Sequence, residues 1–324
     1  MRHATIASTG SYLPTTEVRN EDLSWFPKDT LAKIEEKTGV RCRRHAAQDQ
    51  CTSDLGFLAA RNCLDKASIR PEMLDGIVVS TSSPDRIQPA TATRIQQLLG
   101  APSAFAFDIN SVCSGSVYGI SLADSMIRSG NHNCILFIAA EVYTRILNRN
   151  DFSTYPYFGD GAGAILFVAG QDRGVLHSVL RTDGTGCDVI SVPGGGTMMP
   201  FEQIGNARSA YFKMDGKTVF AFAVEKGTEV ILELLNKSQV PLTDIRLFVS
   251  HQANINILIS IAAALDVPTD RFFVNLDRYG NTASASVPIT LDEALESGRA
   301  KPGDLIVTVA FGGGLSWGAN LILV

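Results

Sequence analysis

Apolar and polar residues follow two patterns along this chain, one typical of buried strands and one typical of amphipathic helices. Short runs rich in Val, Ile, Leu and Phe predict strands at 76–81, 104–109, 133–140, 164–168, 247–250, 272–275, 305–310 and 319–324. Longer stretches with apolar residues three or four positions apart predict helices at 52–67, 90–99, 114–129, 218–236, 255–265 and 284–296. This alternation indicates βαβ units, and therefore an α/β fold with largely parallel sheets.

Two parts of the chain repeat a similar order of elements. Residues 134–168 and residues 304–324 each contain an apolar strand, a glycine-rich turn and a second apolar strand. Upstream of each part lies a strand followed by a helix, and these junctions carry Cys113 and His251. We interpret the repetition as a duplicated fold with halves 1–170 and 171–324, and with its site at their junction. A chance likeness between two α/β halves is the alternative.

Cys113 lies between a predicted strand and a predicted helix, among small residues. The N-terminus of a helix carries partial positive charge and free N–H groups, which favour a thiolate and can also hold a developing oxyanion. Small neighbours such as Ser111, Ser114 and Gly115 leave room for a substrate. The sequence therefore makes Cys113 a candidate nucleophile, and a buried structural cysteine is the plainer alternative.

His251 and Asn281 occupy similar junctions in the second half of the chain. The predicted strand 247–250 ends immediately before His251, and the predicted strand 272–275 ends shortly before Asn281. Because strand ends of an open α/β sheet converge on one crevice, we expect both side chains to meet Cys113 there. A structural histidine and an asparagine that only caps a helix are the alternatives.

The composition excludes several classes of function. The 324 residues carry a net charge of −5 with no run of Lys or Arg, which argues against nucleic-acid binding. The longest apolar stretch, 257–265, is too short to span a membrane, and the first residues lack the apolar core of a signal peptide. Six cysteines without a CxxC pair argue against a metal site or a disulfide scaffold, and they predict a cytoplasmic protein.

Cysteine, histidine and asparagine in one crevice suit the chemistry of thioesters. Cys113 would take an acyl group, and N–H donors of neutral His251 and Asn281 would stabilise the enolate formed when a second thioester loses CO₂. Backbone N–H groups of Cys113 and of Gly314, in the turn 312–314, would hold the oxyanion of the acyl intermediate.

Seven segments of the chain resemble those of β-ketoacyl-acyl-carrier-protein synthase III, a condensing enzyme of the thiolase superfamily. They are KTGVRCRRHA (37–46), FDINSVCSG (107–115), FGDGAGA (158–164), MDGKTVFAFAV (214–224), SHQAN (250–254), YGNTASASVP (279–288) and FGGGLSWGA (311–319). The resemblance implies a five-layered αβαβα thiolase fold of two duplicated halves, a homodimer, and a catalytic set of Cys113, His251 and Asn281. It also implies acyl-CoA and a malonyl thioester as substrates, with no bound cofactor and no metal.

Four positions near the implied acyl pocket depart from this family's pattern. By the resemblance, Gln88, Ser116, Tyr143 and Arg149 border the pocket or its entrance, where Gln88 and Ser116 stand in place of the usual Phe. This predicts a more polar pocket and a starter with a polar, carboxylate or aryl group. A surface position for Gln88 and Arg149 is the alternative.

Three hypotheses of function follow. The first is a synthase III-type condensing enzyme that uses malonyl-acyl carrier protein or malonyl-CoA. The second is an acyltransferase of specialised metabolism with a non-malonyl acceptor. It is favoured because basic residues that dock the acidic carrier protein in the family are replaced by Ala221 and Asn256. The third is an inactive partner subunit, which the presence of Cys113 disfavours.

Overall fold

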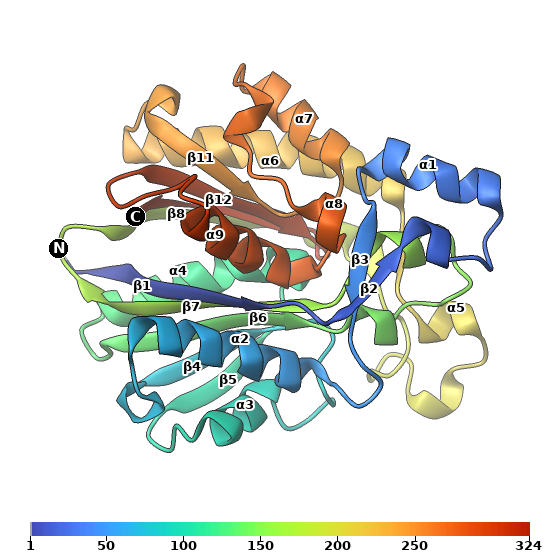
Figure 1. Cartoon of the computed structure of the whole chain (residues 1–324), viewed down its shortest axis with the longest axis horizontal. Helices are drawn as coiled ribbons and strands as arrows, with labels where there is room; N and C mark the ends of the chain where they lie inside the picture. Colours follow the sequence, from blue (N-terminus) through green and yellow to red (C-terminus); the bar gives the residue numbers. More distant parts are fainter. Residues whose placement is uncertain (1) are drawn as a thin grey trace.

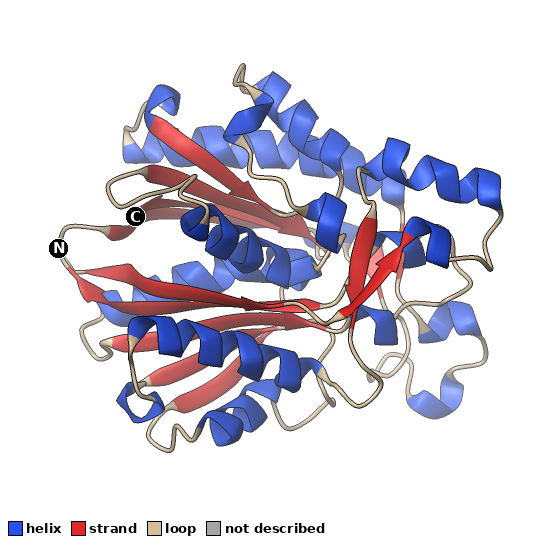
Figure 2. Cartoon of the chain, viewed as in Figure 1, coloured by secondary structure: helices blue, strands red, loops and turns tan. Residues whose placement is uncertain are grey.

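The computed structural model describes residues 2–324, which form alternating layers of helices and sheets (Figure 1, Figure 2). One sheet has the strand order β1-β7-β6-β4-β5, with β1 His3–Tyr12, β4 Gly76–Ser80, β5 Phe105–Ile109, β6 Cys134–Glu141 and β7 Gly161–Gly170. The other has the order β11-β12-β13-β8, with β8 Gly174–Thr182, β11 Ile245–Ser250, β12 Leu305–Gly312 and β13 Ser316–Leu323. The division predicted between residues 170 and 171 coincides with the end of β7, just before the turn to β8.

Helices cover both sheets on the outside and fill the space between them. The outer helices are α2 Thr52–Ala67 and α3 Thr91–Leu99 on the first sheet, and α6 Gly216–Ser238 and α7 Ile255–Ala264 on the second. The central layer consists of α4 Gly115–Arg128 and α9 Ser286–Glu296, which contact strands of both sheets. These are the five layers αβαβα that the family resemblance implies, and Figure 1 shows them stacked from α2 and α3 to α6 and α7.

The remaining elements are short and lie at the end of the molecule away from the termini (Figure 1). They are β2 Thr16–Arg19, α1 Lys28–Thr38, β3 Cys42–His45, β9 Ile190–Ser191, α5 Ala207–Ala210, β10 Lys213–Met214 and α8 Leu276–Tyr279.

The sheets are mixed, which corrects the prediction of largely parallel sheets. Only β4–β5, β4–β6 and β11–β12 pair in parallel, whereas β1–β7, β6–β7, β12–β13 and β13–β8 are antiparallel. The tight turn after Gly312 explains one of these pairs, because so short a connection can join only antiparallel strands. The predicted strand 272–275 is also wrong. There, only Phe272 bridges to Phe248 before the chain turns into α8.

The central layer exists because its helices are made of small or apolar residues on nearly every side. In α4, a Cβ added at Gly119 would lie 2.0 Å from the ring of Phe137 in β6, so the helix can approach the sheet only with glycine there. In α9, buried residues run without a break from Ser286 to Ala294 except at Glu293. A helix that is buried all round must lie between layers rather than on the surface.

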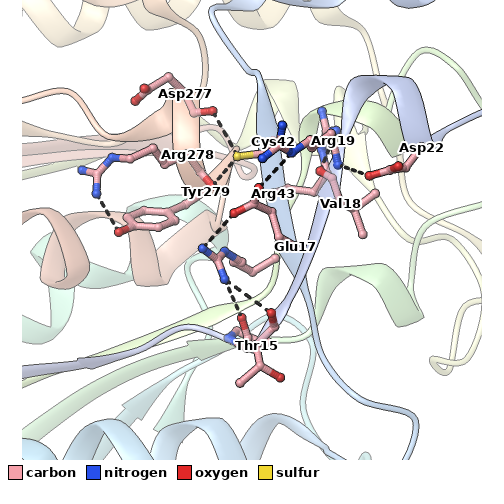
Figure 3. Close-up of polar contacts among 12 residues, drawn as sticks. Thr15, Glu17, Val18, Arg19, Asp22, Cys42, Arg43, Asp277, Arg278 and Tyr279 are labelled. Carbon is pink, nitrogen blue, oxygen red and sulfur yellow. Dashed lines mark hydrogen bonds and ion pairs between the residues drawn. The ribbon is translucent and has the colours of Figure 1, made fainter.

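The β2–β3 ribbon joins the first half of the chain to the segment that leads into Asn281 (Figure 3). The Cys42 thiol lies 3.3 Å from the carbonyl oxygen of Arg278 in α8, and the backbone N–H of Arg41 donates to the carbonyl of Asp277 at 3.0 Å. The N–H of Asp160 donates to the Arg44 carbonyl at 2.8 Å. Residues far apart in the sequence are thus held together immediately beside the predicted site.

Candidate active site

Cys113 lies where the chain passes from β5 through the 3-10 helix Val112–Ser114 into α4. Val112 has φ 47°, a left-handed conformation that costs a β-branched residue about 1–3 kcal/mol. The following Cys113 side chain is only 6% exposed. Burial, together with the charge of the nearby Glu141, raises the pKa of the Cys113 thiol. The N-terminus of α4 acts in the opposite direction and favours the thiolate.

His251 follows β11 directly, and its backbone N–H donates to the carbonyl of Val309 at 2.8 Å. The imidazole is 1% exposed, and its Nδ1 lies 2.7 Å from the hydroxyl of Ser286 in α9. Burial lowers the pKa of His251 to about 3. The imidazole is therefore neutral at ordinary pH, and one of its ring nitrogens carries a hydrogen that can be donated.

Asn281 is fixed by backbone bonds on both sides, between α8 and the 3-10 helix Ala283–Ala285. Its N–H donates to the carbonyl of Tyr157 at 2.8 Å, and its carbonyl accepts from the N–H of Gly159 at 3.0 Å. Its side-chain Oδ1 accepts from the N–H of Ala283 at 2.8 Å. Asn281 can therefore cap the following helix and also act in catalysis. Its Oδ1 accepts the capping bond, which orients the amide, and its NH₂ group is left to donate elsewhere.

One cavity of about 550 Å³ brings the three residues together. Cys113, His251 and Asn281 all line it, and its walls include the aromatic rings of Phe158 and Phe311. Two exposed cations, Lys37 and Lys217, also line the cavity, and their exposure places them toward its mouth. The remaining lining residues are Thr38, Ser153, Tyr157, Ile190, Phe212, Met214, Gly216, Val219, Phe220, Ala253, Asn254, Ile257 and Gly312.

The glycine-rich turn after β12 meets the nucleophile through Gly312. A Cβ added there would lie 2.8 Å from the backbone nitrogen of Cys113, so only glycine allows the two backbones to come so close. Gly314 does not line the cavity, and a Cβ at that position would lie closest to Ser316 rather than Cys113. The structure therefore brings Gly312 against Cys113, and the role of the Gly314 N–H in holding the oxyanion stays a prediction.

Comparisons with known proteins point in one direction. The family described as 3-oxoacyl-[acyl-carrier-protein (ACP)] synthase III matches residues 107–184, and the one described as its C-terminal part matches residues 235–324. The β-ketoacyl-[acyl-carrier-protein] synthase III of Xanthomonas campestris is 40% identical over 320 residues, which are 99% of this chain and 98% of that protein. Its counterpart from Sphingopyxis alaskensis is 41% identical over 326 residues, with 100% and 99% covered.

The chain belongs to the β-ketoacyl-acyl-carrier-protein synthase III family.

Solved structures of relatives agree with this assignment. The 3-oxoacyl-[acyl-carrier-protein] synthase III of Aquifex aeolicus has a TM-score of 0.91 at 35% identity, covering 99% of this chain and 100% of its own. The priming β-ketosynthase of the R1128 polyketide pathway has a TM-score of 0.93 at 31% identity, covering 100% and 96%. The predicted thiolase-superfamily fold is thereby confirmed, and the protein is a condensing enzyme of the synthase III type and thus an acyltransferase.

Synthase III enzymes need no bound cofactor. Within residues 2–324, no group of three or more His, Cys, Asp or Glu side chains is arranged to hold a metal ion. Over the same described residues, no helix is long and apolar enough to cross a bilayer.

The four pocket candidates of this synthase lie in different surroundings. Tyr143 is fully buried in the same cluster of buried side chains as Cys113, and its hydroxyl oxygen lies 2.9 Å from the Oγ of Ser82. Ser116 is buried in α4 and does not line the cavity. Gln88 and Arg149 are exposed, and the Arg149 guanidinium lies 4.1 Å from the centre of the Trp25 ring.

Sequence reasoning missed Glu141, Ser82 and Ser286 in this synthase. Glu141 is fully buried at the end of β6, whose eight residues are all buried. The sequence CILFIAAE did offer a signal for Glu141, because an acidic residue ends an otherwise apolar strand there. Buried acids are rare without hydrogen-bonding partners, so such a residue indicates a special role. Ser82 and Ser286 carried no such signal, since their importance comes only from the groups they contact.

Proposed function

We propose that this synthase III transfers an acyl group from an acyl-CoA to Cys113 and then joins it to the enolate of a malonyl thioester. The Cys113 thiolate attacks the acyl carbonyl, and the CoA thiolate leaves. The malonyl thioester then loses CO₂, and its enolate attacks the carbonyl of the acyl-cysteine. A carbon–carbon bond forms, the cysteine sulfur leaves, and the product is a β-ketoacyl thioester.

The observation that carries the proposal is the shared cavity of Cys113, His251 and Asn281. Decarboxylation places negative charge on the malonyl thioester oxygen, which needs uncharged hydrogen-bond donors in a site shielded from water. His251 is neutral because burial lowers its pKa, and the NH₂ of Asn281 is oriented by the bond that its Oδ1 accepts from Ala283. The backbone N–H of Cys113, and a backbone N–H of the turn 312–314, would hold the oxyanion of acyl transfer, and Gly312 packs directly against the backbone of Cys113.

The carrier of the malonyl group distinguishes two forms of this proposal. Relatives are named for the acyl carrier protein, and Lys37 and Lys217 supply positive charge for an acidic carrier or for the phosphates of CoA. The uncharged Ala221 on α6 and Asn256 on α7 favour malonyl-CoA instead.

We also propose a cytoplasmic homodimer, in which the exposed Gln88 would reach a partner's pocket.

Intact-mass spectrometry tests the proposal. The protein is incubated with acetyl-, medium-chain, dicarboxylic and aromatic acyl-CoAs, and an acyl adduct is expected on Cys113 with at least one of them. The Cys113→Ala variant should form no adduct, whereas a matched variant of the exposed Cys187, Cys187→Ala, should acylate normally. The absence of an adduct with every donor would contradict the first half-reaction.

A second measurement tests the roles of His251 and Asn281. The acylated protein is chased separately with malonyl-acyl carrier protein and malonyl-CoA, and CO₂ release and the β-keto product are measured. His251→Ala and Asn281→Ala should acylate but lose decarboxylation by about 10²-fold or more, since each removes a donor to the enolate. The exposed His177→Ala is the control. Condensation at the wild-type rate in His251→Ala would refute the assignment, and acylation without any malonyl product would favour a non-malonyl acceptor.

A further inference from the structure

The two helices of the central layer, α4 and α9 (Figure 1), begin in the same way. A 3-10 helix precedes each of them: Val112–Ser114 leads into α4, and Ala283–Ala285 leads into α9. Both 3-10 helices start at a residue with φ 47°, and both carry a buried thiol or hydroxyl side chain at the second position, Cys113 in one and Ser284 in the other. Ser284 therefore has in the second half of the chain the position that the nucleophile has in the first.

The strands that end against these two 3-10 helices differ in their last residue. Strand β12 ends at Gly312 beside Cys113, and β6, which also has eight residues, ends at Glu141 beside Ser284. Cys113 and Gly312 line the active-site cavity, whereas Ser284 and Glu141 do not. The carboxylate of Glu141 fills its place instead, and its Oε1 accepts a hydrogen bond from the Ser284 hydroxyl at 2.6 Å. One junction is open to substrate, and the other is closed by a hydrogen bond.

Glu141 is itself fixed by the loop that follows β4. The residue is fully buried. Its Oε2 accepts from the hydroxyl of Ser83 at 2.6 Å and from the backbone N–H of Ser83 at 3.1 Å, and its Oε1 accepts from the hydroxyl of Ser82 at 3.2 Å. A buried carboxylate is unfavourable unless hydrogen bonds satisfy its oxygens, so these bonds hold the side chain in one position. The Ser284 hydroxyl is thereby attached to a rigid group.

The residue before Ser284 contacts the partners of both enolate donors. The N–H of Ala283 donates to Oδ1 of Asn281 at 2.8 Å. The carbonyl oxygen of Ala283 lies 2.9 Å from the hydroxyl of Ser286, which lies 2.7 Å from Nδ1 of His251. The φ of 47° at Ala283 is unfavourable for a residue other than glycine and persists only where neighbouring contacts impose it. The hydrogen bond of the next residue, Ser284, supplies such a contact.

We propose that Glu141 is a positioning residue for the decarboxylation step: through Ser284 it fixes Ala283, and thereby the donor groups of Asn281 and His251. The inference rests on the proposed function, because that function assigns the two donors to the enolate. Glu141 itself contacts no substrate in this role and transfers no proton.

The nucleophile does not depend on this hydrogen bond. Its 3-10 helix is held separately, because the hydroxyl of Ser114 lies 2.7 Å from that of Ser316 in β13 and 2.8 Å from the carbonyl oxygen of Ser111. The loss of the bond between Glu141 and Ser284 should therefore affect the two half-reactions unequally, which a general loss of stability would not do.

Single-turnover kinetics separate the two half-reactions. Ser284→Ala and Glu141→Ala should each slow CO₂ release from the malonyl thioester by about tenfold to a hundredfold, because the donors lose their alignment. The acyl adduct on Cys113 should form at close to the wild-type rate. Since both changes break one bond, the double variant should lose no more than the worse single variant. If Glu141→Ala does not fold, Ser284→Ala decides, because it removes one hydroxyl only.

Two further variants serve as controls for the bond. Ser83→Ala removes an equally short hydrogen bond to Glu141, on the side of the loop after β4, and should release CO₂ at close to the wild-type rate. Glu141→Gln should retain most of the rate, because its amide N–H can still donate to the Ser284 hydroxyl oxygen. Equal losses in both half-reactions, additive losses in the double variant, or a loss in either control as large as that in Ser284→Ala would overturn the proposal.

Hydrogen–deuterium exchange tests the positioning without any substrate. Residues 281–286 should exchange faster in Ser284→Ala than in the wild type, residues 111–116 should not change, and Ser83→Ala should alter neither segment. Unchanged exchange at 281–286 would refute the positioning role whatever the activity. Faster exchange there, with no CO₂ release from the wild type, would refute the proposed condensation and leave the link from Glu141 to this segment standing.

Discussion

The Nδ1 atom of His251 lies 2.7 Å from the hydroxyl oxygen of Ser286, and the same hydroxyl lies 2.9 Å from the carbonyl oxygen of Ala283. A serine hydroxyl has one hydrogen, so its direction decides the tautomer of the imidazole. When Ser286 donates to the Ala283 carbonyl, it can only accept from Nδ1–H, whereas when it donates to Nδ1 the hydrogen of neutral His251 is on Nε2. This is the tautomer that can donate to an enolate in the cavity.

Ser286→Ala should therefore slow decarboxylation of the malonyl thioester by about tenfold to a hundredfold, because Nδ1 loses the hydrogen-bond partner that fixes the tautomer. Acylation of Cys113 should remain close to wild type. Single-turnover measurements of acyl adduct and of CO₂ release separate the two steps. The control is Ser297→Ala, just beyond the same helix, whose exposed hydroxyl bonds only backbone carbonyls. An equal loss in both steps would show that Ser286 serves folding rather than the tautomer.

Gly312→Ala should impair acylation at Cys113 by about tenfold or more. The atoms that an added Cβ would meet, at 2.8 and 3.0 Å, are the backbone nitrogen and Cβ of Cys113, which cannot turn away as a flexible side chain would. The acyl-adduct rate measures the effect. Gly184→Ala is the matched control, because nothing lies within 4 Å of the Cβ it would add. An unchanged rate in Gly312→Ala would mean that the turn can shift without moving the nucleophile.

Arg43→Met should destabilise the protein by about 2–3 kcal/mol. The guanidinium of Arg43 is completely buried and donates to the carbonyls of Val18 at 3.1 Å and Pro156 at 2.5 Å. Its removal leaves those acceptors unpaired next to the segment that holds Asn281. Chemical denaturation measures the free energy of unfolding. Arg41→Met, which removes an exposed ion pair with Glu35, should cost about 1 kcal/mol or less. Similar losses in the two variants would contradict the buried role.

His45 should make the protein less stable as the pH falls. Burial, and then the charge of Arg43, lower the pKa of His45 to about 4, whereas an unfolded chain has a value of about 6.5. Between these values the unfolded state binds the proton and the folded state does not. The contribution of His45 is therefore fully present above about pH 6.5 and is lost as the pH falls toward 4.

The measurement is the free energy of unfolding at about pH 7 and pH 5. It should fall less in His45→Phe than in the wild type, because the variant keeps the ring packed against Tyr155 without a titrating group. Other titrating groups cancel in this comparison. An equal fall in both proteins would show that His45 takes up its proton in the folded state.

The sequence predicted most of the fold because strands and helices leave local signals. The helix predicted at 52–67 forms as Thr52–Ala67, and the strand predicted at 104–109 forms as Phe105–Ile109. The exceptions have physical causes. Residues 272–275 are apolar enough for a strand, but only Phe272 pairs with β11 before the chain turns into α8. Helix α1 was missed because its polar sequence buries only Leu31, Ile34 and Thr38.

By itself, the sequence determined the layered α/β fold and the candidates Cys113, His251 and Asn281, because periodicity and residue type are properties of neighbouring positions. Only the tertiary structure decided that Gly312 packs against the backbone of Cys113, and that Glu141 is buried among the hydroxyl groups of Ser82, Ser83 and Ser284. Those contacts join separate strands and loops, and no local pattern encodes their distances. The tautomer of His251 depends in the same way on Ser286, thirty-five positions further along the chain.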